Sequence, residues 1–360
     1  MTASDSEEAD VVAAIRAGDA AAFAALGERY RRRLHVHCYR MLGSFDDAED
    51  LVQDTLLRAW RGRDGFEGRS LFRTWLYRIA TNACLSALER APRRVLPQDV
   101  APPVTAASDA SNAPSTPPWA PDVPWLSPYP DHLLDAAAPS EAEPEAQLAS
   151  RETVALVFLA ALQHLPPRQR AILVLGDVLG WSAAETAAQL ELSVAAVNSA
   201  LQRAHATMRA QLPAGWPPRP AVTAPTDDER AALDAFMAAW GRADAAALVA
   251  LLREDARWAM PPAPLWFDGR DAIARLFARF PMDFHGDVVM RPIGANRQPA
   301  AAAYLRPHGA SEYRLTGINV LRIDLSTRLS TRLSTRAGAI AEITTFSGAL
   351  CAGFGLPATL

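Results

Sequence analysis

Side chains suited to binding a macromolecule gather around the aromatic run that begins at Phe72. Arginines, a hydroxyl and an amide make up the group: Arg69, Ser70, Arg73, Arg78 and Asn82. Guanidinium groups pair with phosphates, and an amide such as that of Asn82 can read a base edge. From residue 23 to residue 94 the chain has fourteen arginines against nine acids, a modest positive excess. The positive excess suits DNA as a partner, but the spacing alone does not show that role.

A second polar group lies upstream and alternates with apolar residues at helical spacing. Its members are Asp47, Asp50, Gln53, Asp54 and Arg58. Ser44, with Asp47 three residues later, predicts a capping box and a helix that begins near Phe45. The apolar face of that helix comprises Ala48, Leu51, Val52, Thr55, Leu56 and Ala59. By itself, the opposite charged face is typical of a solvated helix surface.

The elements around the first group are a glycine-containing loop and a helix. The loop spans residues 65–70, and its glycines permit close approach of another backbone. The helix that follows has a buried face predicted from spacing: Phe72, Trp75, Leu76, Ile79 and Ala83. The arginines and Asn82 lie off this face, so they remain available for contacts.

A helix-turn-helix pattern follows about a hundred residues later. Ser182 and Glu185 predict a capping box on its first helix, and Ser193 is a suitable N-cap for the second. The second helix is predicted to span residues 194–209, with Val197 and Leu201 inward. Side chains expected to face a DNA major groove are Ser193, Asn198, Ser199, Gln202 and Arg203.

Composition limits the remaining possibilities. A chain of 360 residues is long enough for two or three domains. No apolar run approaches the roughly 18 residues that span a membrane, and the acidic start lacks the plan of a signal peptide. Three scattered cysteines, Cys38, Cys84 and Cys351, predict a reducing, cytoplasmic environment rather than a disulfide framework. His35, His37 and Cys38 lack a fourth ligand nearby, so neither a metal nor another cofactor is expected.

Breaks in composition divide the chain into blocks. Residues 95–149 are proline-rich, acidic and free of basic side chains, which predicts an extended linker. Residues 213–225 form a second, proline-rich hinge. The folded blocks are therefore two all-α domains, 10–94 and 150–212, and a third domain, 226–350. The third has helix patterns at 228–239, 243–253 and 270–280 and strand patterns at 256–260, 283–293 and 313–324, which is an α+β arrangement.

The third block offers few residues that could do chemistry. Aromatic and histidine side chains could line a pocket, although such spacing also suits a plain core: Trp240, Trp258, Trp266, His285 and Tyr304. Asp255, Asp268 and His285 are candidate acid-base groups, but no spacing requires catalysis. A Ser-Thr-Arg-Leu repeat at 326–336 fits either an elongated hairpin or a tandem duplication without function. The block is not expected to be an enzyme.

Taken in order, these parts resemble an extracytoplasmic-function (ECF) RNA polymerase sigma factor. The resemblance rests on the run Asp-Ala-Glu-Asp-Leu-Val-Gln-Asp at 47–54, the arginine-aromatic helix and the helix-turn-helix. It implies that the acidic helix binds the β′ coiled coil of core RNA polymerase. It also implies that the loop and helix at 65–82 melt the −10 promoter element, where the loop holds a flipped base, and that the helix-turn-helix binds the −35 element. The linker would thread the polymerase cleft towards the RNA exit path.

The resemblance has two departures and one extension. Glu191 stands in the turn where glycine is common, and Asn198 and Ala200 replace residues that are often basic, as in a subfamily called SigG-type. Residues 259–273 and 317–324 make the third block similar to SnoaL-like domains, which are cone-shaped α+β barrels. That block is expected to modulate the sigma factor and could bind an unknown small ligand. The alternatives are a helix-turn-helix regulator with a ligand-binding domain, or a SnoaL-like cyclase or isomerase fused to a DNA-binding module.

Overall fold

The computed structural model describes residues 14–15, 17–66, 72–105, 120, 122–136, 154–213, 225–279, 281–282, 285–328 and 338–360. The chain forms two compact units, each built from two separate stretches of sequence. A helical unit combines Met1–Arg93 with His132–Pro218, and a C-terminal unit combines Arg94–Asp131 with Arg219–Leu360. Each unit is described by itself.

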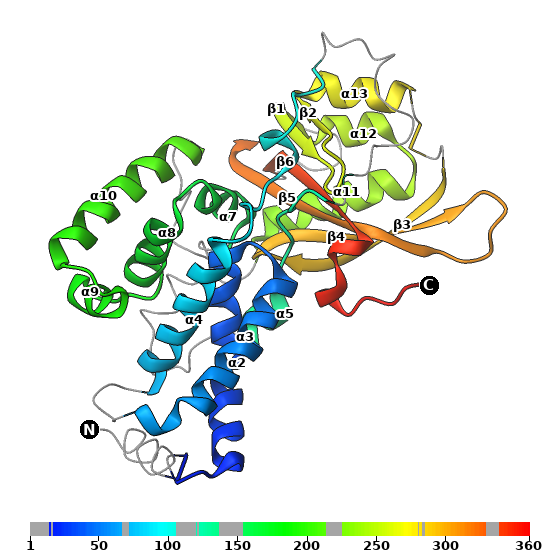
Figure 1. The fold of residues 1–360 in the computed structure, drawn as a ribbon. Coiled ribbons are helices and arrows are strands. Elements are labelled where there is room, and N and C mark those ends of the chain that lie inside the picture. Colours follow the sequence, from blue (N-terminus) through cyan, green and yellow to red (C-terminus); the bar gives the residue numbers. More distant parts are fainter. Residues whose placement is uncertain are drawn as a thin grey trace. The chain divides into compact units, whose positions relative to one another are not determined.

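Three packed helices account for most of the described residues in the first half of the helical unit (Figure 1). They are α2 (Ala20–Leu42), α3 (Phe45–Arg61) and α4 (Phe72–Leu88), with a 3-10 turn, η1, at Arg63–Gly65. As predicted, α3 begins after Ser44, whose hydroxyl accepts the Asp47 N–H at 3.3 Å. Its buried face is made of Ala48, Val52, Thr55 and Ala59. Small residues on this face let α3 pack closely against α2 and α4.

The second half contains the predicted helix-turn-helix. Its elements are α7 (Leu156–Gln163), α8 (Pro167–Leu173), the π-helical turn η4 (Val174–Val178), α9 (Ala183–Leu190) and α10 (Val194–Gln211). The capping box of Ser182 and Glu185 is present, and Ser193 caps α10 by accepting the Ala196 N–H at 3.1 Å. Ile172, Ala187, Val197 and Ala200 form a core that fixes α9 against α10. The sequence prediction of this motif is confirmed.

A buried arginine joins the two halves. Arg170 on α8 is 2% exposed, and its guanidinium donates to the Met41 carbonyl at the end of α2. It also donates to the Gln163 carbonyl and side chain at 3.1 and 2.8 Å and to the Leu165 carbonyl at 3.2 Å. The last carbonyls of a helix lack helical partners. Arg170 therefore satisfies the C-terminal ends of α2 and α7 together.

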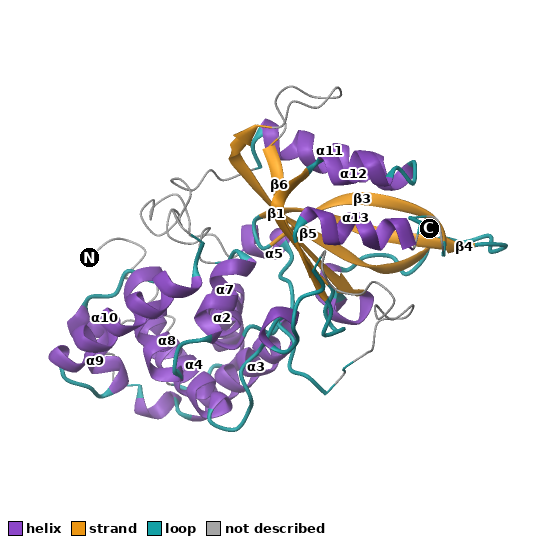
Figure 2. Ribbon diagram, turned by 90° about the horizontal axis from the view of Figure 1, so that it is seen from above, coloured by secondary structure: helices purple, strands orange, loops and turns teal. Residues whose placement is uncertain are grey.

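The C-terminal unit is an α+β domain with one six-stranded sheet (Figure 2). Its helices are α11 (Asp227–Gly241), α12 (Ala245–Ala250) and α13 (Arg270–Arg279). Its strands are β1 (Leu252–Ala259), β2 (Trp266–Asp268), β3 (Gly286–Ala295), β4 (Gln298–Pro307), β5 (Arg314–Arg328) and β6 (Gly338–Ser347). The strand order is β2-β1-β6-β5-β4-β3, and β1 and β6 are the parallel pair. The predicted fold class is confirmed.

The core of this unit lies between the sheet and its helices. Phe236 of α11 and Phe277 of α13 pack against inward-facing sheet residues such as Trp258, Leu321 and Ile343. Sequence patterns found these helices and three of the strands, but missed β2, β4 and β6. The strand β4 contains four consecutive alanines, which have low strand propensity. Its register with β3 and β5, rather than local preference, holds it extended.

The described parts of residues 94–131 are not the solvated linker that composition predicted. Trp125, Leu126 and Tyr129 are 3%, 0% and 0% exposed. Val104 pairs with the edge strand β2, accepting from Asp268 N–H at 3.0 Å and donating to the Trp266 carbonyl at 2.9 Å. The prediction of an extended linker is wrong for these residues because large apolar side chains among the prolines are buried.

The same segment also holds the opposite edge of the sheet. Pro130 bridges to Ala295 at the β3–β4 turn, and Asn296 donates its N–H to the Tyr129 carbonyl at 2.9 Å. The Asn296 side chain, 0% exposed, accepts the Tyr129 N–H at 2.9 Å. Asp131 accepts the Arg297 N–H at 2.8 Å. Both sheet edges are thus bound by a stretch that precedes the helix-turn-helix in sequence.

The Ser-Thr-Arg-Leu repeat lies mostly outside the described residues. Its first members belong to β5, and Arg328 at the end of β5 pairs with Gly338 at the start of β6. Those two strands are antiparallel neighbours, which fits the hairpin interpretation at its base.

Candidate docking and nucleic-acid surfaces

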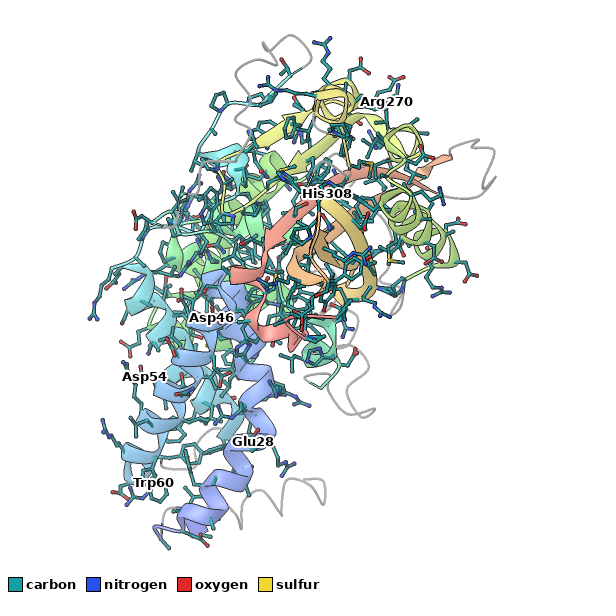
Figure 3. All side chains as sticks on the ribbon, turned by 90° about the vertical axis from the view of Figure 1, so that its right-hand side faces the viewer. Glu28, Asp46, Asp54, Trp60, Arg270 and His308 are labelled. Atoms are coloured by element: carbon teal, nitrogen blue, oxygen red, sulfur yellow. The ribbon has the colours of Figure 1, made fainter. Side chains whose placement is uncertain are left out.

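The outward face of α3 carries acidic side chains around an exposed leucine. Asp46, Asp50 and Gln53 are exposed, and Asp54 pairs with Arg58 at 2.8 Å. Asp46 and Asp54 follow one another along α3 in Figure 3. Leu57 is 46% exposed, whereas the other described leucines of the helical unit are buried or half-buried. An exposed apolar side chain within a charged rim is typical of a protein-binding surface.

Leu57 was not among the residues predicted from sequence. The signal was available, because Leu57 lies three residues after Asp54 and seven after Asp50, on their side of a helix. Of the predicted residues, Asp47 is half-buried near the capped end, whereas Asp50 and Gln53 are fully accessible. The structure therefore brings the predicted acidic group together and adds an apolar centre to it.

The helix α4 presents its predicted polar residues unequally. Arg78 and Asn82 are exposed, and Arg73 is half-buried. Arg69 and Ser70 lie outside the described residues. Phe66, Phe72 and Trp75 pack against one another in tilted and edge-on arrangements, with ring centroids 4.9 to 5.8 Å apart. This aromatic cluster fixes the start of α4, so the polar residues project from a rigid base.

The predicted contact residues of α10 lie on one accessible side. Ser193, Asn198, Ser199, Gln202 and Arg203 are all exposed. Arg203 donates to the Ser199 hydroxyl at 2.6 Å, one helical turn away. These five residues supply amides, hydroxyls and one guanidinium but no carboxylate, which suits the edges of base pairs.

The C-terminal unit does not bring its five predicted pocket residues together. Trp240 and Trp258 are in contact, with ring centroids 6.2 Å apart, and both pack on Phe277. The Trp258 indole donates to Thr345 at 2.8 Å, and Thr345 donates to the buried Asn319 side chain at 2.6 Å. Trp266 lies elsewhere and donates to the Ala101 carbonyl at 2.9 Å. Tyr304 is buried in β4 and His285 is exposed.

Two of the three candidate acid-base groups of this unit, Asp255 and Asp268, are ion-paired. Asp255 accepts two hydrogen bonds from Arg253, both 2.8 Å long, and these bonds lower the pKa of its carboxyl. Asp268 pairs with Arg257 at 3.3 Å. Within the described residues these carboxylates serve as surface partners of arginines, and nothing in their geometry indicates catalysis.

Comparison with known proteins identifies the family. Sigma-70 region 2 matches residues 26–94, sigma-70 region 4 matches residues 155–208, and a SnoaL-like domain matches residues 233–325. The ECF RNA polymerase sigma factor SigG of Mycobacterium tuberculosis is 45% identical over 293 residues, which cover 81% of this chain and 75% of SigG. This chain belongs to the ECF RNA polymerase sigma factors.

Two further relatives define how far the likeness extends. SigW of Bacillus subtilis is 28% identical over 55% of this sigma factor and 92% of SigW. The crystal structure of the M. tuberculosis ECF sigma factor SigJ covers 93% of the chain and 99% of SigJ, with a TM-score of 0.54 and 20% identity. That likeness supports the fold, including a C-terminal α+β domain. No described helix of this sigma factor is long and apolar enough to span a bilayer.

The buried histidines and cysteines of the helical unit have pKa values that are shifted by burial and by neighbouring side chains. Burial lowers the pKa of His37 to about 3, and its Nε2 lies 3.0 Å from the Thr81 hydroxyl. Burial lowers the pKa of His35 to about 4, although Glu49 at 3.5 Å opposes the shift. A hydrogen bond with Cys38, reinforced by burial, raises the pKa of Cys84. Among the described residues no group of three metal-ligating side chains converges.

Proposed function

We propose that this ECF sigma factor binds core RNA polymerase through the outward face of α3 and promoter DNA through α4 and α10, so that it directs transcription initiation. The observation that carries the proposal is the face of α3, defined by Asp46, Asp50, Gln53, Asp54 and Leu57. Its carboxylates call for a basic partner, and complementary charge speeds encounter and selects the partner. Leu57 adds the apolar contact that such a rim surrounds.

The partner that fits this face is a helical surface with basic side chains around an apolar position. The family resemblance identifies it as the β′ coiled coil of the polymerase. Arg58 extends from the same surface but is held by Asp54 at 2.8 Å, so its role is to orient Asp54 rather than to repel the partner.

Promoter recognition is divided between two helices in this proposal. On α4, Arg73 and Arg78 contact phosphates and Asn82 contacts a base of the opened −10 element. On α10, Asn198 and Gln202 reach base edges of the −35 element, since amides of this kind pair with adenine. With Arg203 as the basic member of that set, α10 makes few phosphate contacts, and binding by this half alone is expected to be weak.

The C-terminal domain modulates these activities in the same proposal and has no catalytic role. Support comes from its binding of residues 94–131, which connect the two DNA-binding halves. A change in the domain would reach both halves through that segment. The ion-paired state of Asp255 and Asp268 agrees with a role other than catalysis. A small ligand and a cytoplasmic location remain predictions.

The test of core binding uses charge reversal on α3. The variant Asp50→Arg with Asp54→Arg should lose co-purification with core polymerase, because like charges then meet at the interface. A matched control reverses two exposed acids of the C-terminal unit, Asp234→Arg and Glu312→Arg, and should bind normally. Circular dichroism establishes that both proteins are folded. Wild-type recovery of polymerase by the α3 variant would remove the proposed docking face.

A further inference from the structure

The turn of the helix-turn-helix contains a glutamate in a conformation that favours glycine. Glu191 has φ 55° and ψ 46°, and its N–H caps α9 by donating to the Ala187 carbonyl. A side chain at such positive φ crowds its own backbone, whereas glycine adopts it freely. The turn therefore needs no carboxylate for its own geometry. The side chain of Glu191 must be explained by what it contacts.

Glu191 contacts the helix proposed to bind the −10 element. Its Oε1 lies 3.0 Å from Nη2 of Arg78, an exposed residue of α4. One residue before Arg78, the Tyr77 ring packs edge-on against the Trp181 ring, with centroids 6.1 Å apart. Trp181 directly precedes the capping box of α9. Two separate contacts thus join one edge of α4 to the helix-turn-helix.

A third interaction between α4 and the helix-turn-helix is electrostatic. Hydrogen bonds from Ser182 lower the pKa of the Glu185 carboxyl, and the positive charge of Arg73 adds to this effect. Arg73 and Arg78 of α4 are thus both near carboxylates of the helix-turn-helix. The buried Arg170, through the Met41 carbonyl, fastens the same two halves from within.

A guanidinium binds carboxylate and phosphate oxygens with similar geometry. Arg78 cannot direct the same N–H groups to both at once. We propose that Glu191 takes the place of a promoter phosphate on Arg78, so that the free protein holds its two DNA-reading halves against each other. Promoter DNA must displace Glu191 before Arg78 can bind a phosphate. This inference rests on the proposed DNA contact of α4.

The strength of the pair sets the size of the effect. Both side chains are accessible, 49% for Arg78 and 78% for Glu191, so solvent and salt weaken their attraction. The pair delays DNA binding without preventing it. Its removal should tighten binding about two- to fivefold at low salt, and less at high salt.

The test measures binding of full-length protein to a fluorescein-labelled single-stranded DNA of about 20 nucleotides and mixed sequence, by anisotropy in low and high NaCl. A phosphate contact is independent of base sequence, so a mixed strand is a suitable probe. Glu191→Gln keeps the backbone conformation and removes the charge, and should bind two- to fivefold more tightly at low salt. Glu89→Gln removes an exposed charge near the end of α4 and should bind as wild type does.

A double-mutant cycle separates competition from a general charge effect. In the Arg78→Ala background, binding weakens and Glu191→Gln should change nothing further. An equal gain in both backgrounds would show simple repulsion between Glu191 and DNA and would overturn the inference. So would an equal gain from Glu89→Gln, or an unchanged affinity in Arg78→Ala. Core-polymerase binding, which depends on α3, should stay normal in every variant, and its absence in wild type would speak against the proposed function instead.

Discussion

Truncation of Arg170 tests how the two halves of the helical unit are joined. In Arg170→Ala, the Met41, Gln163 and Leu165 carbonyls and the Gln163 side chain lose their donor. A buried acceptor without a partner costs roughly 1–3 kcal/mol. Four such losses at the low end give about 4 kcal/mol.

The Arg170 Nε–H also has no acceptor among the described residues, which lowers the native contribution by about 1 kcal/mol. The expected net destabilisation is therefore about 3 kcal/mol, a large share of the stability of a domain. The stability of Arg170→Lys should lie between those of the wild type and Arg170→Ala, because one ammonium group cannot reach the ends of both helices. Burial lowers the pKa of Arg170 only to about 10, so the wild-type side chain stays charged at neutral pH.

Urea denaturation followed by hydrogen exchange and mass spectrometry is the appropriate assay, since the two units can unfold separately. Protection should fall in 20–42 and 156–173 and stay unchanged in 227–259. Arg168→Ala, an exposed arginine two residues away, is the matched control and should have no effect. A loss below 1 kcal/mol, or a loss confined to the C-terminal unit, would refute this account of Arg170.

Three further outcomes are expected. Lowering the pH from 6.5 to 5.5 should destabilise the helical unit by about 1 kcal/mol for each buried histidine. The pKa values of His35 and His37 are lowered to about 4 and about 3, so these side chains bind protons in this pH range only when the chain is unfolded. The variant His37→Gln should halve the pH dependence of the urea midpoint. Trp125→Ala should lower the stability of the C-terminal unit by about 3–5 kcal/mol and raise hydrogen exchange in residues 286–307. Val100→Ala, at an exposed position, should do neither. Equal hydrogen exchange in the two variants would contradict the binding of residues 94–131 to the C-terminal unit. Arg203→Ala should weaken binding of a selected −35 duplex by about 1–3 kcal/mol if Arg203 reads a guanine. Asn82→Ala should reduce permanganate reactivity at the −10 element and leave the affinity for duplex DNA unchanged. If both variants lost only closed-complex affinity, the assignment of α10 to the −35 element and α4 to the −10 element would be contradicted.

Sequence patterns were informative where structure is set within a few residues. The helix beginning at Phe45 and the recognition helix from Val194 follow from caps and apolar spacing, and both are present. Failures occurred where the partner is distant. Tyr129 is buried by residues 167 positions later, and no local pattern reports this. Glu191 was recognisable as unusual in its turn, but Arg78, its partner, lies 113 positions earlier.

The site was predictable to a similar degree. Spacing placed Asp50 and Asp54 on the outward face of α3, and the same spacing puts Leu57 on that face. The pocket residues show the opposite case. Trp240 and Trp258 meet because α11 and β1 pack across a core. Trp266 lies on β2 opposite Ala259 of β1, so its side chain is on the other face of the sheet from Trp258, and sequence patterns missed β2.

The binding of residues 94–131 to the C-terminal sheet also affects folding during synthesis. Tyr129 leaves the ribosome 167 residues before Asn296, which at about 5–20 residues per second is a delay of roughly 10–30 s. During that interval the whole helix-turn-helix is synthesised, while Tyr129 still lacks its partner Asn296. The helical unit can thus form in a nascent chain in which the apolar side chains of residues 94–131 are still exposed. Nascent chains of this protein are expected to need a chaperone over this stretch of synthesis, and release from it would coincide with completion of the C-terminal domain.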